Sequence, residues 1–141
     1  MKKREIDLLI IEDNEAFSLL LERELANYLN QRQIKEKFRI NMLTFLSSDE
    51  CLQAIRKSPP NKDTISFIDF YLGEAINGLH VLKLLHERQK NIQVVMMSKS
   101  PHVKDKIQNL TMDNLNLHFI VKDEYTPVMC KMLLETFLES L

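Results

Sequence analysis

The sequence contains little glycine and little cysteine, and both shortages exclude kinds of site. Its two glycines, Gly73 and Gly78, are too few for the glycine-rich loops that hold nucleotide phosphates, so P-loop and dinucleotide-binding fingerprints are absent. The two cysteines, Cys51 and Cys130, lie in segments with helical patterning and lack the spacing of metal ligands. We therefore predict buried thiols in a reducing compartment.

The chain also has almost no net charge and contains no long apolar run. Its 141 residues carry a formal net charge of -1, which gives no overall attraction to nucleic acid or to an acidic membrane surface. No apolar segment approaches the roughly 20 residues that cross a bilayer. The run 8–11 is interrupted by acids too early for an export signal. We expect a cytoplasmic protein in which residues 1–141 form a single domain.

Apolar patterning predicts strands that alternate with helices along the whole chain. The expected strands are 6–11, 38–45, 65–68, 91–97 and 117–121. The expected helices are 14–30, 48–57, 79–89, 101–110 and 126–141, with polar connections at 31–37 and 111–116. Ser47, Ser100 and Thr126 are expected to cap three of these helices. Such alternation is typical of a doubly wound parallel sheet with helices on both faces.

Four of the expected strands end in polar side chains. The first strand is followed by Glu12 and Asp13, the third by Asp69, the fourth by Ser98 and the fifth by Lys122. The carboxyl ends of parallel strands lie at one edge of a sheet, and α/β proteins bind their ligands at that edge. We therefore expect these residues to form a single site. Each signal alone is weak, since Asp13 is also a suitable N-cap for the following helix.

The carboxylates of Glu12, Asp13 and Asp69 together indicate a metal site. Three acids at one sheet edge would repel one another unless a cation lay among them. Oxygen-rich coordination of this kind suits Mg²⁺, or Mn²⁺, with other positions open to a substrate phosphate. Lys122 would add a positive charge and Ser98 a hydroxyl, and both groups bind phosphoryl oxygens. The residues thus indicate phosphate chemistry at a carboxylate.

In this arrangement the sequence resembles the receiver domain of bacterial two-component response regulators over essentially its whole length. The resemblance rests on the acidic pair 12–13, on Asp69, and on Ser98 and Lys122, which stand in the family's order and near its spacing. It implies a flavodoxin-like, three-layer α/β/α fold with five helices and a five-stranded parallel sheet of order 2-1-3-4-5. Residues 1–141 would then form one receiver domain.

The resemblance assigns a metal site and a phosphoacceptor. Asp69 would accept the phosphoryl group. Asp13 would bind Mg²⁺ directly, Glu12 would be its acidic companion acting through water, and the backbone carbonyl of Tyr71 would complete the metal site together with Asp69.

The resemblance also implies a switch. Ser98 and Lys122 would bind the phosphoryl oxygens, and Ser98 would move inward. Phe119, at the family's aromatic switch position, would then turn into the vacated space. The domain would catalyse its own phosphorylation and dephosphorylation without being a conventional enzyme.

Partners follow from the same resemblance. A sensor histidine kinase or a histidine phosphotransfer protein would donate the phosphoryl group, and a downstream protein or a fused output domain would respond to it. A homodimer would use the face made by helix 101–110, strand 117–121 and helix 126–141. The chain lacks a basic helix-turn-helix, so we expect no direct nucleic acid partner, and no membrane partner either.

Several positions depart from the family's pattern. Glu12 replaces an aspartate, the loop 69–78 is longer than usual, and Asp123 replaces a proline. Lys99 stands at a usually small position beside the phosphorylation pocket, where it can attract phosphoryl oxygens or obstruct access. Phe119 lacks the hydroxyl of a tyrosine switch, so switching would work by packing alone.

These departures leave a second function open, a pseudo-receiver that binds a protein partner without turning over phosphate. A phosphatase of the haloacid dehalogenase type is a weaker alternative. That class needs a second acid two residues after its nucleophile, where this chain has Tyr71.

Overall fold

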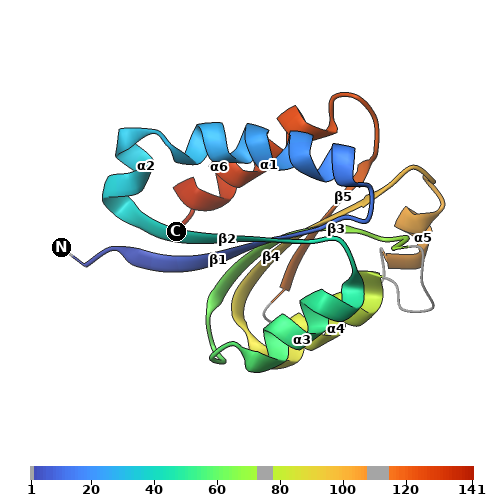
Figure 1. Cartoon of the computed structure of the whole chain (residues 1–141), viewed down its shortest axis with the longest axis horizontal. Helices are drawn as coiled ribbons and strands as arrows, with labels where there is room; N and C mark the ends of the chain where they lie inside the picture. The colour runs from blue at the N-terminus through green and yellow to red at the C-terminus, as the bar shows by residue number, and fades with distance from the viewer. Residues whose placement is uncertain (1, 73–77, 108–114) are drawn as a thin grey trace.

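The computed structural model describes residues 2–72, 78–107 and 115–141, in which strands and helices alternate (Figure 1). The strands are β1 Arg4–Ile11, β2 Phe38–Phe45, β3 Asp63–Asp69, β4 Lys90–Ser98 and β5 Leu115–Val121. The helices are α1 Glu15–Leu29, α2 Arg32–Lys37, α3 Ser48–Lys57, α4 Gly78–Arg88, α5 Val103–Ile107 and α6 Thr126–Glu139. None of these described helices is long and apolar enough to span a membrane.

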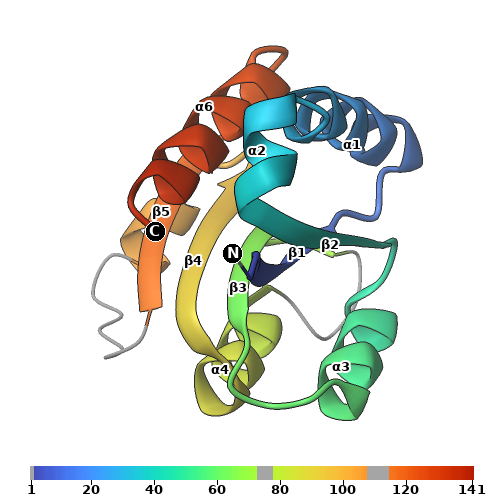
Figure 2. The ribbon, with the colours of Figure 1, turned by 90° about the vertical axis from the view of Figure 1, so that its left-hand side faces the viewer.

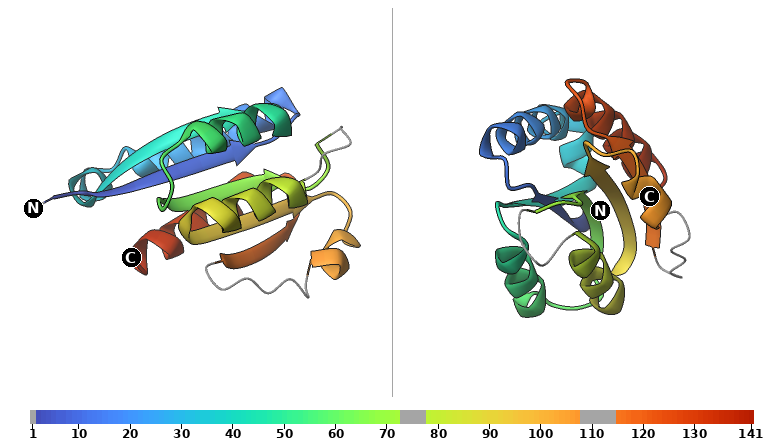
Figure 3. Two further views of the ribbon diagram at one scale, coloured as in Figure 1. Left: turned by 90° about the horizontal axis from the view of Figure 1, so that it is seen from below. Right: turned by 90° about the vertical axis from the view of Figure 1, so that its right-hand side faces the viewer.

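All five strands run parallel in one sheet of order β2-β1-β3-β4-β5, which is the predicted order. Their arrowheads point to the same end of the molecule (Figure 3). Neighbouring strands end almost level with one another at that end: the last pair of β1 and β3 is Ile11 with Ile68, and the last pair of β4 and β5 is Ser98 with Val121. The residues that follow the strands therefore meet at one side of the sheet, which we call the carboxyl edge.

Helices cover both faces of the sheet and give the predicted three layers. Helices α1, α2 and α6 lie on one face, α3 and α4 lie on the other, and α5 lies near β5 (Figures 1 and 2). Alternate residues of β1 enter different cores: Leu8 and Ile10 pack toward α1 and α6, whereas Leu9 and Ile11 pack toward α3 and α4. Burial on both sides explains why the central strands read as continuous apolar runs. The two cysteines are buried, as predicted.

Helix α2 corrects the prediction that residues 31–37 form a polar connection. The described part of the chain thus has six helices rather than the five expected. Ile34 is the only apolar residue of α2 and packs half-buried against the core under α1 and α6. An ion pair between Arg32 Nε and Glu36 Oε1 (2.9 Å) adds i,i+4 support. One apolar residue in a single short helix gives no periodicity to detect.

Capping explains where α1 and α3 begin. Ser47 caps α3, as predicted, because its Oγ accepts a hydrogen bond from the Glu50 backbone N–H (3.2 Å). At α1 the cap is Asn14, whose Oδ1 accepts from the Phe17 N–H (3.0 Å). Asp13 is therefore not the cap of α1.

One helix start and one helix cap predicted from proline are wrong. Helix α5 begins at Val103 rather than at residue 101, and the predicted end of that helix at residue 110 lies outside the described residues. Thr126 is the first residue of α6 rather than its cap. Its Oγ1 instead accepts from the Asp123 N–H (2.8 Å), while Asp123 Oδ1 accepts from the Tyr125 N–H (2.8 Å). A turn closed by Asp123 thus precedes α6.

Candidate functional site at the carboxyl edge

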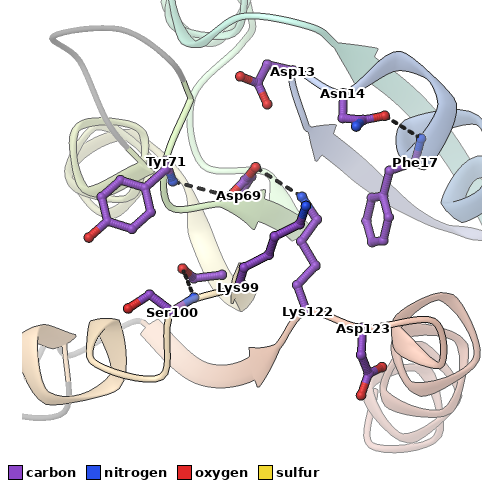
Figure 4. Close-up of a pocket in the computed structure, with 10 residues that line it drawn as sticks. Asp13, Asn14, Phe17, Asp69, Tyr71, Lys99, Ser100, Lys122 and Asp123 are labelled. Atoms are coloured by element: carbon purple, nitrogen blue, oxygen red, sulfur yellow. Dashed lines mark hydrogen bonds and ion pairs between the residues drawn. The ribbon is translucent and has the colours of Figure 1, made fainter.

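The carboxyl edge carries the polar residues that follow β1, β3, β4 and β5. Backbone hydrogen bonds continue one residue past the strands: the Glu12 N–H donates to the Phe45 carbonyl (3.0 Å) and the Lys122 N–H donates to the Ser98 carbonyl (2.8 Å). A pocket of about 490 Å³ opens above them, and Asp69 and Asp13 line it (Figure 4). The sheet itself thus holds the backbone beside the functional side chains.

The three predicted acids converge. Glu12, Asp13 and Asp69 each offer a carboxylate oxygen, and these oxygens lie within 4.8 Å of one another. Glu12 is fully buried and Asp69 is 6% exposed, whereas Asp13 is exposed at the pocket. Residues far apart in the chain therefore form one acidic cluster, in which Asp13 is open to solvent and the other two carboxyl groups are buried.

Lys122 lies among the acids. Its Nζ is 3.2 Å from Asp69 Oδ2 and also donates to Glu12 Oε1. The ammonium lies 4.4 Å from the ring centroid of Phe17, which adds a cation–π contact. This single cation is therefore shared between two buried carboxyl groups.

The charge states of Glu12 and Lys122 follow from this packing. The pKa of Glu12 rises from 4.5 to about 8, mainly because the carboxyl group is buried; a hydrogen bond with Asp69 and the Asp69 charge also raise it, and Lys122 opposes them. Burial by itself lowers the pKa of Lys122, yet its hydrogen bond to Glu12 and the Asp69 charge outweigh burial, so the net shift is upward. Without a metal ion, Glu12 therefore holds a proton near neutral pH while Lys122 stays charged.

The donor set fits a hard divalent cation. Glu12 Oε2 is buried and has no hydrogen-bond partner in the described part of the chain, so it has a lone pair to offer. Three carboxyl groups meet here and Lys122 contacts only two of them, Glu12 and Asp69, so positive charge is in deficit. Mg²⁺ or Mn²⁺ would supply that charge and displace the proton from Glu12.

Tyr71 and Ser98 take up positions beside Asp69. The Tyr71 N–H donates to Asp69 Oδ1 (3.2 Å) and orients the carboxylate (Figure 4). Ser98 is buried, and its Oγ accepts from the Ser100 N–H (3.1 Å), which leaves its hydroxyl hydrogen available to an incoming acceptor. Metal binding by the Tyr71 carbonyl stays a prediction.

Phe119 does not line this pocket. It pairs with Met96 in the β4–β5 register and packs half-buried against the core under α3 and α4. A switching role for its ring therefore stays a prediction.

Two residues of the pocket escaped the sequence analysis in this role. Phe17 packs half-buried against the core under α1 and α6, and its ring also contacts the Lys122 ammonium at the pocket. Asn14 also lines the pocket. The available signal was their place in the first turn of the helix after Glu12, since that turn begins at the carboxyl edge.

Gly78 allows α4 to start close to Asp69. A Cβ atom at this position would lie 2.9 Å from the Asp69 carbonyl oxygen and 3.0 Å from Ile68 Cγ2. No real side chain tolerates the first of these distances without a shift of the backbone. The glycine is therefore required by close packing of the helix against the end of β3.

No protein-family model matches the sequence, and no curated protein matches it. Solved structures do match. A response regulator receiver protein from Sinorhizobium medicae WSM419 superposes with a TM-score of 0.66 at 11% identity, covering 96% of this chain and 95% of that one. The beryllofluoride-activated receiver domain of NtrC superposes with a TM-score of 0.56 at 16% identity, covering 93% of this chain and 92% of that one. The chain thus has the receiver-domain fold.

Proposed function

We propose that residues 1–141 form a phosphoacceptor receiver domain that takes a phosphoryl group onto Asp69 in a Mg²⁺-dependent reaction. The observation that carries this proposal is the meeting of Glu12, Asp13, Asp69 and Lys122 at one sheet edge. Buried charges of this kind cost stability, so folding alone gives no reason to gather them. The receiver fold of the similar structures adds support.

The acids would hold the cation. Asp13 and Asp69 would bind Mg²⁺, or Mn²⁺, directly, with Glu12 as their acidic companion and the Tyr71 carbonyl as a further ligand. The bound ion would neutralise oxygens shared between the donor and Asp69.

Asp69 would act as the nucleophile. One of its carboxylate oxygens forms a bond to phosphorus while the bond between phosphorus and the donor's imidazole nitrogen breaks, and the electron pair leaves with the imidazole. Lys122, whose Nζ is 3.2 Å from Asp69 Oδ2, would bind an oxygen of the transferred group. Ser98 would donate its hydroxyl hydrogen to another oxygen.

The partners we propose follow from that chemistry. The donor is a phosphohistidine on a sensor kinase or phosphotransfer protein, and the reaction takes place in the cytoplasm. Movement of Ser98 and Phe119 would change the face made by α5, β5 and α6. Helix α6 carries the exposed apolar side chains Val128 (45%), Met129 (44%) and Met132 (58%), which suit a second copy, a downstream protein or an output domain.

Phosphorylation by a small donor tests the proposal. The wild-type protein, incubated with Mg²⁺ and acetyl phosphate, should gain one phosphoryl group by intact mass. The Asp69→Asn variant should gain none, because it lacks the nucleophile. The wild-type protein with a chelator in place of Mg²⁺ should react far more slowly.

The other outcomes separate the alternatives. Equal labelling of Asp69→Asn would remove Asp69 as the acceptor. A wild-type protein that binds Mg²⁺ but takes up no phosphoryl group would instead be a pseudo-receiver, which binds a partner independently of phosphorylation.

A further inference from the structure

Lys99 brings a second ammonium group to the pocket. It follows the last residue of β4, lines the pocket, and points into it toward Asp69 and Lys122 (Figure 4). Its side chain is exposed. Among residues 2–72, 78–107 and 115–141, no carboxylate forms an ion pair with Lys99.

The two lysines of the pocket differ in what holds them. Lys122 is nearly buried, with 8% of its side chain exposed, and already contacts both Glu12 and Asp69. Any further anion must compete with those acids for Lys122. Lys99 has no such partners among the described residues, so its charge is available to a group that arrives from solvent.

Phosphorylation would change the charge of the site. Asp69 carries a single negative charge as a carboxylate, whereas an acyl phosphate carries close to two near neutral pH. The pocket must therefore accommodate an additional negative charge beside acids that share one lysine. Asp123, also at the pocket, points away from Asp69 (Figure 4), and its Oδ1 accepts from the Tyr125 N–H.

We propose that Lys99 is a phosphoryl-binding residue, whose ammonium pairs with the oxygens of a dianionic phosphodonor and then with the phosphoryl group on Asp69. It binds the group and takes no part in bond making. This inference rests on the proposed function and adds an electrostatic selectivity: donors that arrive as dianions are favoured over donors that arrive as monoanions.

Two small phosphodonors that differ in net charge distinguish an effect of the Lys99 charge from an effect of the Lys99 side chain on the shape of the pocket. Acetyl phosphate reacts as a dianion and phosphoramidate as a monoanion. The Lys99→Gln variant should lose roughly fivefold in the second-order rate constant with acetyl phosphate at low salt, the size expected of an exposed ion pair. With phosphoramidate the loss should stay within about twofold, and high salt should shrink the difference between donors.

A second measurement follows the product state without any donor. Beryllofluoride in the presence of Mg²⁺ mimics the phosphoryl group on Asp69, and the Lys99→Gln variant should need roughly fivefold more of it for half saturation. Lys99→Arg keeps the charge and should stay close to wild type in both measurements. Lys57→Gln removes the same charge at the far end of α3 and serves as the matched control.

Each other outcome overturns the inference. A Lys99→Gln variant that reacts as fast as wild type, or faster, shows that Lys99 does not bind the phosphoryl group. Equal losses with both donors indicate a change of pocket shape rather than charge. If the wild-type protein takes up no phosphoryl group, the proposed function itself fails, and it fails separately from a negative result confined to Lys99.

Discussion

The Glu12 carboxyl group is fully buried beside Asp69 and Lys122, with one oxygen left unpartnered in the described structure. Its surroundings disfavour the carboxylate so strongly that its pKa rises to about 8. This residue therefore couples the protonation of the site to the stability of the whole domain.

That coupling predicts a pH dependence of stability in the metal-free protein. The unfolded chain loses the Glu12 proton near pH 4.5, whereas the folded protein keeps it up to about pH 8. Between these values the folded state binds more protons, so the free energy of unfolding falls as pH rises. We expect a fall on the order of 5 kcal/mol over this range, measured by urea unfolding with a chelator present.

The Glu12→Gln variant is the control for this pH dependence. It has the shape of the protonated side chain but cannot ionise, so its free energy of unfolding should change less over the same pH range. Parallel curves for the two proteins would contradict the raised pKa of Glu12.

Among the elements, the close contact of α4 with β3 depends on Gly78. Gly78→Ala would force the new Cβ against the Asp69 carbonyl oxygen, 2.9 Å away, and push the start of α4 outward. We expect a loss of about 1 to 3 kcal/mol in the free energy of unfolding. Under the proposed function, the shift of the backbone at Asp69 should also slow phosphorylation of the protein. Lys83→Ala, at an exposed position of the same helix, should change neither quantity.

Helix α1 offers a matched pair of leucines. Leu21 is fully buried in the core shared with α6, whereas Leu20, its neighbour, is 56% exposed. Leu21→Ala should lower the free energy of unfolding by about 3 kcal/mol because it leaves a cavity. Leu20→Ala should stay within about 0.5 kcal/mol of wild type in the same denaturant titration. A large loss at Leu20 would mean that α1 buries a different face.

At the scale of helices and strands, the sequence predicts features that rest on a repeated apolar pattern, and it does not predict features that depend on one or two local contacts. The alternation of apolar strands and amphipathic helices is sufficient for a parallel sheet covered by helices on both faces, whereas the strand order came from the resemblance to receiver domains. Helix α2 was missed because Ile34 alone carries its apolar side. Thr126 is not the cap of α6, because its hydroxyl accepts from the Asp123 N–H in the turn before the helix and Thr126 itself is the first helical residue.

For the molecule as a whole, the convergence of the site follows from topology. Once all strands are parallel, residues after β1, β3, β4 and β5 must share an edge, and Glu12, Asp69 and Lys122 do so. Depth of burial and side-chain direction do not follow from strand order. The raised pKa of Glu12 and the Phe17 ring beside Lys122 therefore became visible only in the packed structure.

Binding of Mg²⁺ at the acidic cluster should raise the free energy of unfolding of the whole domain. An ion that binds only the folded state adds ~2.7 kcal/mol to the free energy of unfolding at about 100 times its dissociation constant. The proposed ion would displace the proton from Glu12, so its binding at neutral pH should also release close to one proton, measured by calorimetry in buffers of different ionisation enthalpy.

Asp13→Asn separates this metal effect from folding. Asp13 is exposed and is not the cap of α1, so the variant should fold with wild-type stability in a chelator and yet lose most of the stabilisation by Mg²⁺. Glu87→Gln, an exposed charge removed from α4, should keep the full response. If Mg²⁺ stabilises the Asp13→Asn variant as much as the wild-type protein, the ion does not bind at the acidic cluster. The proposal that Asp69 is a metal-assisted phosphoacceptor would then be wrong.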